Sequence, residues 1–447
     1  MKKSLSTVLI FLLAWALVIV IPHFQQQNSI LSSLISGLVA CFAFVAIRNI
    51  LEIETSPRNV YLVLLGTLSI YITAVLLLFQ GNESLYGYWS KFGAGSMVLN
   101  GSLVPFGDLA QITSAINCGT PLEVGVNICD PWGRLLNQNP DVVKVFHFLN
   151  FSNLNYIGVL STILFFSLIL SSIHRQQVNN LSIPVFLITP VCVLAIERAN
   201  ELITMILILG GLLLLSQAKR IMHPFGAILL GCAAIFKLWP IILVFFTFVF
   251  AIRKHHILTK LLLVAPMLYW FINFNLAKAA LHSTQKGSPS GASFGASLFV
   301  DERIPRMLQG LYISISVAVL VLLIRYFKQR STYVEGLCNS QREAAIICST
   351  FFTYFSVWLV GQSFMYRYLL VLPALLVLVR PHNWRSQGTR LVVSLILVSA
   401  FTAKLQISMV LTSSLAFTLL YLAIVLLGRW FNFSARMISR PLNISDS

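Results

Sequence analysis

The stretch AAIFKLWPII, residues 233–242, decides how this chain is threaded through its fold. It lies inside a run of about 28 mostly apolar residues, 225–252, which is long enough for one membrane-spanning helix. A lysine near the centre of such a helix costs about 3 kcal/mol on insertion scales. Either the run does not cross a membrane as a single helix, or Lys237 has a functional role there.

The composition predicts a membrane protein. Of the 447 residues, 57% are hydrophobic and 10% are charged, whereas a soluble domain carries about 25% charged residues. Apolar runs of membrane-spanning length recur along the chain, for example at 4–22, 30–47, 60–79 and 155–173. We therefore predict an all-α fold, a polytopic transmembrane helical bundle that forms one integral membrane domain over residues 1–447.

The net charge of +17 could indicate a nucleic-acid partner. The basic residues are not gathered in one soluble segment, however, and they recur in clusters between apolar runs, as the positive-inside rule describes. We therefore expect no nucleic acid and place both termini in the cytoplasm. The run at 4–22 could also be a signal peptide, but no small-residue cleavage site follows it, so we expect it to be the first span.

The charge pattern also predicts the path of the 225–252 run. If it were one helix, the basic cluster at 253–256 and the later basic loops would all face outside, against the rule. Two short passes, 225–236 and 240–252, remove the conflict. Pro240 favours a break there because proline lacks an N–H group and disfavours helix just before it. Lys237 would then lie at the turn, near the outer surface, facing a cavity.

This topology has about 14 spans, several of them short or re-entrant. Most of the 31 Lys and Arg residues then face the cytoplasm, and most of the 14 Asp and Glu residues face outside. Two external loops, 81–153 and 275–306, are too long to be simple connections. We therefore expect the active site on the periplasmic or external face of the cell (inner) membrane, in a multi-pass protein.

The first external loop contains FGDLAQITSAI, residues 106–116, which indicates a short amphipathic helix. Asp108 near its start could complement the helix dipole, or it could be a functional carboxylate. Cys118 and Cys129 are the two cysteines of seven that this topology places outside. They could form a disulfide bond, which the exterior permits, or remain two free thiols.

Two more external turns carry charge. AIERANELI, residues 195–203, is either an exposed hairpin tip or part of the cavity around Lys237. Its polar residues are Glu197, Arg198, Asn200 and Glu201. GQSFMYRYLLVLP, residues 361–373, holds Arg367, which could be a snorkelling arginine in an aromatic belt.

The predicted position of these charges at the same edge of the bilayer favours a binding or catalytic site. Arg198, Lys237 and Arg367 reach the predicted outer edge of the bilayer from different helices, and cations there suit a lipid-linked phosphate. A loop carboxylate such as Asp108 suits a general base.

Five short strings then resemble the GT-C class of membrane glycosyltransferases, and family 87 in particular, which includes polyprenol-phosphate-mannose-dependent mannosyltransferases. The strings are FGDL (106–109), CDPWGRLLNQNP (129–140), ERANELI (197–203), AAIFKLWPIIL (233–243) and SFMYRYLLVLPAL (363–375). The chain departs from the family pattern at Gln138, Ala199 and Glu201, and three predicted spans rather than one precede Asp108. These departures bear on the identity of donor and acceptor more than on the class of reaction.

The resemblance implies an inverting transfer of a hexose, mannose being the family's best-known example, from a polyprenyl-phosphate sugar to a glycolipid or polysaccharide acceptor. Asp108 would be the catalytic base, and Lys237, Arg367 and Arg198 would bind the donor phosphate. The remaining substrate-binding candidates are Glu197, Asn200, Glu201, Asp130 and Arg134. We predict no cofactor beyond the lipid-linked donor. No ligand spacing indicates a metal site, and whether Asp108 and Asp130 bind a divalent ion stays open. The partners are the bilayer, the donor and the acceptor glycan.

Two other functions stay open. An O-antigen-type polymerase or ligase would share the many spans and large loops, but it would use a lipid-pyrophosphate oligosaccharide and loops rich in arginine. A lipid-linked sugar transporter or flippase would place charges around a midplane cavity and show a repeat of its spans, and we find no clear repeat. The sequence identifies neither the sugar nor the acceptor.

Overall fold

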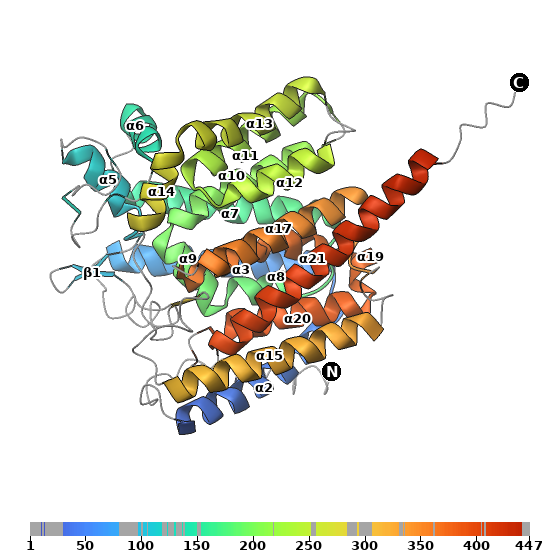
Figure 1. The fold of residues 1–447 in the computed structure, drawn as a ribbon. Coiled ribbons are helices and arrows are strands. Elements are labelled where there is room, and N and C mark those ends of the chain that lie inside the picture. Colours follow the sequence, from blue (N-terminus) through green and yellow to red (C-terminus); the bar gives the residue numbers. More distant parts are fainter. Residues whose placement is uncertain are drawn as a thin grey trace, which may run out of the picture.

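The computed structural model is a bundle of α-helices of very unequal length (Figure 1). It describes residues 10, 13, 30–79, 97–99, 102–104, 106–118, 123, 129–130, 136, 139–149, 153–217, 219–251, 256–283, 293–294, 306–329, 334, 336–360, 363–403, 405 and 408–439. The predicted first span, 4–22, and most of the two predicted external loops lie outside these ranges. The predicted all-α class is confirmed, with two very short strand pairs added to it.

Three helices are long and apolar enough to cross a membrane, among the residues that the structure describes. They are α7 (Leu154–Gln176), α15 (Arg306–Gln329) and α21 (Ser408–Ser439). Shorter apolar helices lie beside them, including α2 (Ile30–Leu51), which packs against α20 (Gln387–Phe401). The chain is thus consistent with a membrane protein, and the count of about 14 spans stays a prediction.

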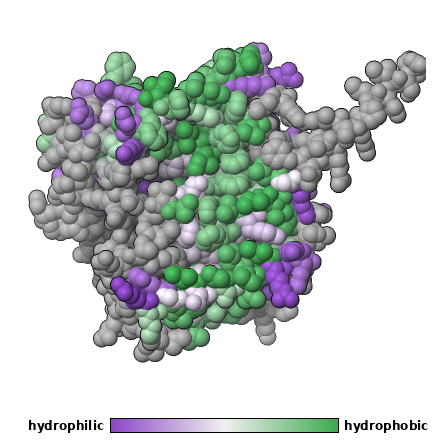
Figure 2. Space-filling model, viewed as in Figure 1, coloured by the Kyte–Doolittle hydropathy of each residue, from purple (hydrophilic) through white to green (hydrophobic). Residues whose placement is uncertain are grey.

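The surface of the bundle has the polarity that a lipid environment requires. In Figure 2 its flank is mainly hydrophobic, and hydrophilic residues gather toward the two ends of the helices. Large apolar side chains are exposed on the long helices, such as Leu164 on α7 and Val321 and Leu322 on α15. A soluble monomer rarely exposes contiguous apolar patches larger than a few hundred Å², so a mainly apolar flank is unusual for one.

The run 225–252 divides where the sequence analysis placed the break. Helix α11 (Met222–Phe236) ends at Phe236, and Lys237 follows with an extended backbone, φ −134° and ψ 141°. Helix α12 begins at Pro240 and ends at Ala251. The predicted pair of short passes separated by Lys237 is confirmed as two separate helices.

Two glycines let α11 lie very close to α10 (Asn200–Leu215). A Cβ atom added to Gly226 of α11 would come within 2.7 Å of the carbonyl oxygen of Gly211 on α10. Small residues at a helix contact allow the two backbones to approach closely. Helices in lipid associate through such packing, because the hydrophobic effect does not drive them together there. Helix α13 (Ile257–Ile272) packs on another side of α11 and is followed by α14 (Phe274–Ser283).

The apolar segment 183–196 does not form one continuous helix. The structure divides it into α8 (Ser182–Leu187) and α9 (Pro190–Arg198), both buried almost throughout. Pro190 is the cause, because it lacks the N–H group needed to continue α8 and suits the first turn of a new helix. Helices α9 and α10 then meet at an angle of 100°, with Ala199 in the left-handed region at φ 57°.

The two ends of the bundle carry different elements. At one end, which we call the α5 end, lie α5 (Ala110–Asn117), α6 (Pro140–Phe148) and the hairpin of β1 (Met97–Leu99) with β2 (Ser102–Val104) (Figure 1). At the opposite end, the α19 end, lies α19 (Pro381–Trp384), between α18 (Leu372–Leu378) and α20. The other described elements are α3 (Pro57–Phe79), α17 (Gln341–Val360), the 3₁₀ helix η2 (Met365–Val371), and strands β3 (Ser293–Phe294) and β4 (Ser363–Phe364).

Candidate functional site

Asp108 lies in a turn just before α5, and its side chain does not cap that helix. The N-cap residue of α5 is Leu109, and no side-chain hydrogen bond caps the helix there. The carboxylate of Asp108 instead accepts a hydrogen bond from Nη1 of Arg198, at 3.4 Å. Both side chains are less than one-fifth exposed. A residue 90 positions away in the chain thus gives Asp108 a tertiary partner that the helix-start interpretation does not explain.

The bend between α9 and α10 at Ala199, which we call the α9–α10 elbow, carries two charged residues that have different partners. Arg198 is the last residue of α9 and reaches Asp108, whereas Glu201 lies in the first turn of α10 and is 1% exposed. One carboxylate oxygen of Glu201 lies 3.9 Å from Nε of Arg367. Arg367 belongs to η2, which packs against both α9 and α10. Two buried ion pairs are therefore adjacent along a short stretch of chain.

Lys237 is a third cation close to these two ion pairs. It is half-buried at the end of α11, where the helix gives way to extended backbone. Its ammonium group is attracted by the charges of Glu201 and Asp108 and repelled by that of Arg367. The structure therefore brings together five charged residues that the sequence analysis singled out, and we call them the ionic cluster. Its members are Asp108, Arg198, Glu201, Lys237 and Arg367.

Helix α6 is fastened to the end of α11 that carries Lys237. The side chain of Asn139 accepts a hydrogen bond from the backbone N–H of Asp141, which caps α6, and donates through Nδ2 to the carbonyl of Ile235, at 3.0 Å. The Tyr269 hydroxyl donates to Asp141 at 2.8 Å. That hydrogen bond, and then a second one from Lys144, lower the pKa of the Asp141 carboxyl below its usual value.

The sequence analysis did not identify this anchor. The sequence nevertheless indicates the start of α6, because Asn139 before Pro140 is a typical N-cap followed by proline in the first helical turn. The rings of Phe146 on α6 and Phe236 on α11 are also in contact, with centroids 6.1 Å apart. The first long loop is thereby attached next to Lys237.

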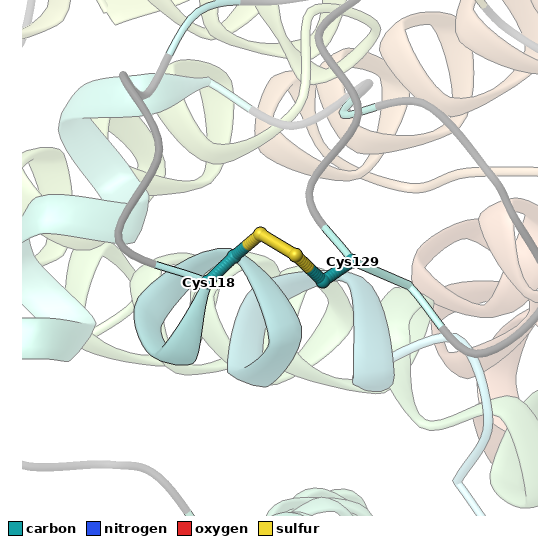
Figure 3. The surroundings of a disulfide bond; sticks show 2 residues. All are labelled: Cys118 and Cys129. Carbon is teal, nitrogen blue, oxygen red and sulfur yellow. A yellow bond between two sulfur atoms is a disulfide. The ribbon is translucent and has the colours of Figure 1, made fainter.

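A disulfide bond joins Cys118 and Cys129, whose Cα atoms lie 5.7 Å apart. Figure 3 shows the bridge running from the end of α5 to a neighbouring segment. Asp130, a substrate-binding candidate, directly follows the bridge and is buried. The bond thus restrains Asp130 relative to the helix that Asp108 precedes.

The second long loop also reaches the ionic cluster. Strand β3 pairs with β4 in antiparallel register, Ser293 opposite Phe364 and Phe294 opposite Ser363. Strand β4 leads directly into η2, which carries Arg367. Both long loops that the sequence analysis placed on one face therefore have described residues near the same cluster.

The other candidates have different outcomes. Glu197 is buried at the α9–α10 elbow, and its backbone carbonyl accepts a hydrogen bond from the amide of Phe106. Asn200 begins α10, but its side chain lies outside the described part of the structure, as does Arg134. In the described ranges, no group of three or more His, Cys, Asp or Glu residues could hold a metal ion.

The chain was compared with protein-family models, with curated proteins and with solved structures. No family model matches it, and no curated protein or solved structure matches it. The resemblance to GT-C glycosyltransferases that the motifs suggested therefore stays a prediction.

Proposed function

We propose that this chain is a membrane glycosyltransferase that moves a hexose from a polyprenyl-phosphate sugar to a glycan or glycolipid acceptor. The observation that carries the proposal is the ionic cluster. Its residues come from the turn before α5, the α9–α10 elbow, the end of α11 and η2, and they converge at one end of an apolar bundle. In this proposal the α5 end faces the periplasm or cell exterior.

The cations of the cluster suit the donor. A polyprenyl-phosphate sugar is held in the bilayer by its hydrocarbon chain, so its phosphate must be bound where the apolar flank ends. Lys237 and Arg367 would bind that phosphate through charge-assisted hydrogen bonds and stabilise the charge that grows on it as the sugar leaves. Glu201, nearly inaccessible to solvent, would orient the Arg367 guanidinium.

Asp108 would act on the acceptor. Its carboxylate takes the proton of an acceptor hydroxyl while that oxygen forms a bond to the anomeric carbon of the donor sugar. The bond between the anomeric carbon and the phosphate oxygen breaks, and the lipid phosphate leaves with the electron pair. Attack from the side opposite to the phosphate inverts the anomeric configuration.

Arg198 links the two halves of the site. In the structure it is bound to Asp108, through a contact of 3.4 Å that is long for a charge-assisted hydrogen bond. An arriving donor phosphate would compete with Asp108 for this guanidinium. Donor binding would then release the Asp108 carboxylate for the acceptor hydroxyl, which predicts that the donor binds before the acceptor.

The test compares surface glycans and glycolipids in three strains: wild type, Asp108→Asn and a gene deletion, with membrane levels of the two proteins matched. We expect Asp108→Asn to reproduce the loss of sugar seen in the deletion, and the missing sugar to identify the donor. If Asp108→Asn retains the wild-type glycans while the deletion loses them, Asp108 is not a base. Transport or polymerisation of a lipid-linked sugar would then explain the deletion better.

A further inference from the structure

The turn that carries Asp108 begins at a strained residue, Phe106. Its φ of 59° places it in the left-handed region, where a bulky side chain is a true outlier. The side chain is also 1% exposed, so it is neither at a free loop tip nor in contact with solvent. Strained backbone of this kind persists only where the surrounding structure holds it, and it is concentrated at functional sites.

Two contacts hold Phe106 in this conformation. Its backbone N–H donates to the carbonyl of Glu197, at 2.6 Å, and Glu197 directly precedes Arg198. Its ring lies against α7 at Gly158, where an added Cβ atom would collide with three ring carbons. Real Cβ atoms essentially never approach so closely, so the ring occupies space that only a glycine at position 158 leaves open.

The ring belongs to a small apolar cluster whose chain segments also carry the charged residues. The cluster contains Phe106, Leu109, Ile112, Ala199 and Phe236. Three of these residues are immediate neighbours in sequence of members of the ionic cluster: Leu109 follows Asp108, Ala199 follows Arg198, and Phe236 precedes Lys237. The same packing therefore sets the relative positions of three chain segments that each contribute a charge.

We propose that Phe106, seated against Gly158, is a positioning residue that holds the Asp108 carboxylate opposite Arg198 and beside Lys237. The inference rests on the proposed function, because it assigns Phe106 to the placement of the base. Displacement of the ring would move the start of the Asp108 turn, and a shift of about 1 Å in a catalytic group can lower the rate about 100-fold. Phe106 would act on the rate of the chemical step and little on donor binding.

The decisive variant is Gly158→Ala, which forces the ring out without touching a charged residue. The matched control is Gly66→Ala on α3, another helical glycine, where an added Cβ meets nothing within 4 Å. A second variant, Gly158→Ala combined with Phe106→Ala, removes the colliding ring. Asp108→Asn is measured in parallel on the same full-length chain.

Two readouts are needed. Transfer is followed in membranes with radiolabelled polyprenyl-phosphate mannose and polyprenyl-phosphate glucose as donor probes, giving kcat and KM for whichever is used. Backbone hydrogen exchange over 106–112 is followed by mass spectrometry on the purified protein. For Gly158→Ala we expect kcat to fall at least 10-fold with KM for the donor within 3-fold, and exchange over 106–112 to rise at least 10-fold.

The double variant, which has no ring to hold the Asp108 turn, should stay at least 10-fold below wild type in kcat, and Gly66→Ala should match wild type. Unchanged kcat in Gly158→Ala, or a lower kcat without faster exchange over 106–112, would overturn the positioning role. So would a double variant with the wild-type kcat. If Asp108→Asn itself transfers at the wild-type rate, the proposed function fails, and this arm distinguishes that failure from the failure of the positioning role alone.

Discussion

The bundle buries carboxylates at both of its ends, but it treats them differently. At the α19 end, Glu343 is almost fully enclosed and accepts hydrogen bonds from Arg380 at 2.6 Å and from the backbone N–H of Asn339 at 2.8 Å. The Nε2 atom of His382 lies 3.0 Å from the same carboxylate, and Asn383 donates to it at 3.3 Å. At the α5 end, the ion pairs of Asp108 and Glu201 have separations of 3.4 and 3.9 Å.

The difference indicates two kinds of role. A buried charge is tolerated when short hydrogen bonds replace the water it has lost, and Glu343 meets this condition with groups from two segments, the one before α17 and the one that forms α19. We interpret Glu343 as a structural residue that links the start of α17 to α19. In the proposed function, the longer separations at the α5 end suit cations that bind a donor phosphate. The predictions below test this contrast.

The largest effect is expected for Asp108→Asn. General-base catalysis contributes about 100-fold to 10,000-fold, so transfer should fall by at least 100-fold. Thermal stability should change less than in a variant of Glu343, because the Asp108 carboxylate is more exposed and its ion pair with Arg198 is longer than that of Glu343 with Arg380. Donor-probe transfer and thermal unfolding of the purified protein, measured side by side, check both parts. A loss of stability as large as that of a core variant would place Asp108 with Glu343 as a structural residue.

Arg367→Lys should have the next largest effect on transfer. Lysine keeps the charge but loses the planar fork that can bind two phosphate oxygens while facing Glu201. We expect kcat/KM for the donor to fall by about 10-fold to 100-fold, less than the roughly 100-fold to 1,000-fold that removal of a charge-stabilising donor costs, because lysine keeps one donor and the charge. Arg385→Lys at the α19 end is the matched control, and it should transfer at the wild-type rate. Equal transfer by the two variants would remove Arg367 from the donor site.

Glu343→Gln should show the opposite pattern. Breaking a buried ion pair destabilises a protein by about 3 to 5 kcal/mol, because Arg380 keeps its charge without a carboxylate to neutralise it. We expect the amount of folded protein in the membrane and the unfolding temperature to fall, while kcat per folded molecule stays near wild type. A variant that folds normally and loses transfer would show that the α19 end takes part in catalysis.

The smallest effect concerns acid stability at the α6 anchor. The folded-state pKa of Asp141 is lowered, first by the hydrogen bond from Tyr269, so this stabilisation is present above the unfolded-state pKa and is lost as the pH falls through the lower folded-state value. Tyr269→Phe should therefore be slightly less stable than wild type at pH 7. The difference should shrink below pH 4. Thermal unfolding from pH 7 to pH 3 checks this, with Tyr61→Phe, a half-exposed tyrosine of α3, as the control.

A difference between wild type and Tyr269→Phe that stays constant across this pH range would mean that Asp141 does not carry the effect. The remaining cost would then come from the hydrogen bonds that the Tyr269 hydroxyl exchanges with Asn139.

Much of this arrangement could be predicted from local rules. The predominance of apolar residues indicated a helical membrane protein, and Pro240 together with the basic clusters located the break beside Lys237. Hydrophobic runs and proline act on the chain where they occur, and the basic clusters act through the order of the spans along the sequence. The same rules brought out Asp108, Arg198, Glu201 and Arg367 as charges close to helix ends.

The pairing of those charges was decided only by the tertiary structure. Nothing local joins Asp108 to Arg198, 90 residues away, and the α9–α10 elbow that aims Arg198 depends on a left-handed alanine that no propensity favours. The contact between Phe106 and Gly158 could not be predicted from the sequence either. The reason for a glycine at position 158 becomes clear only in the folded structure, where the Phe106 ring occupies the space that a side chain would take. Local hydrophobicity and backbone chemistry determine where helices form and break. Which charges meet depends on packing among distant segments, because burial forces each charge to find a partner within the space that the packed helices leave.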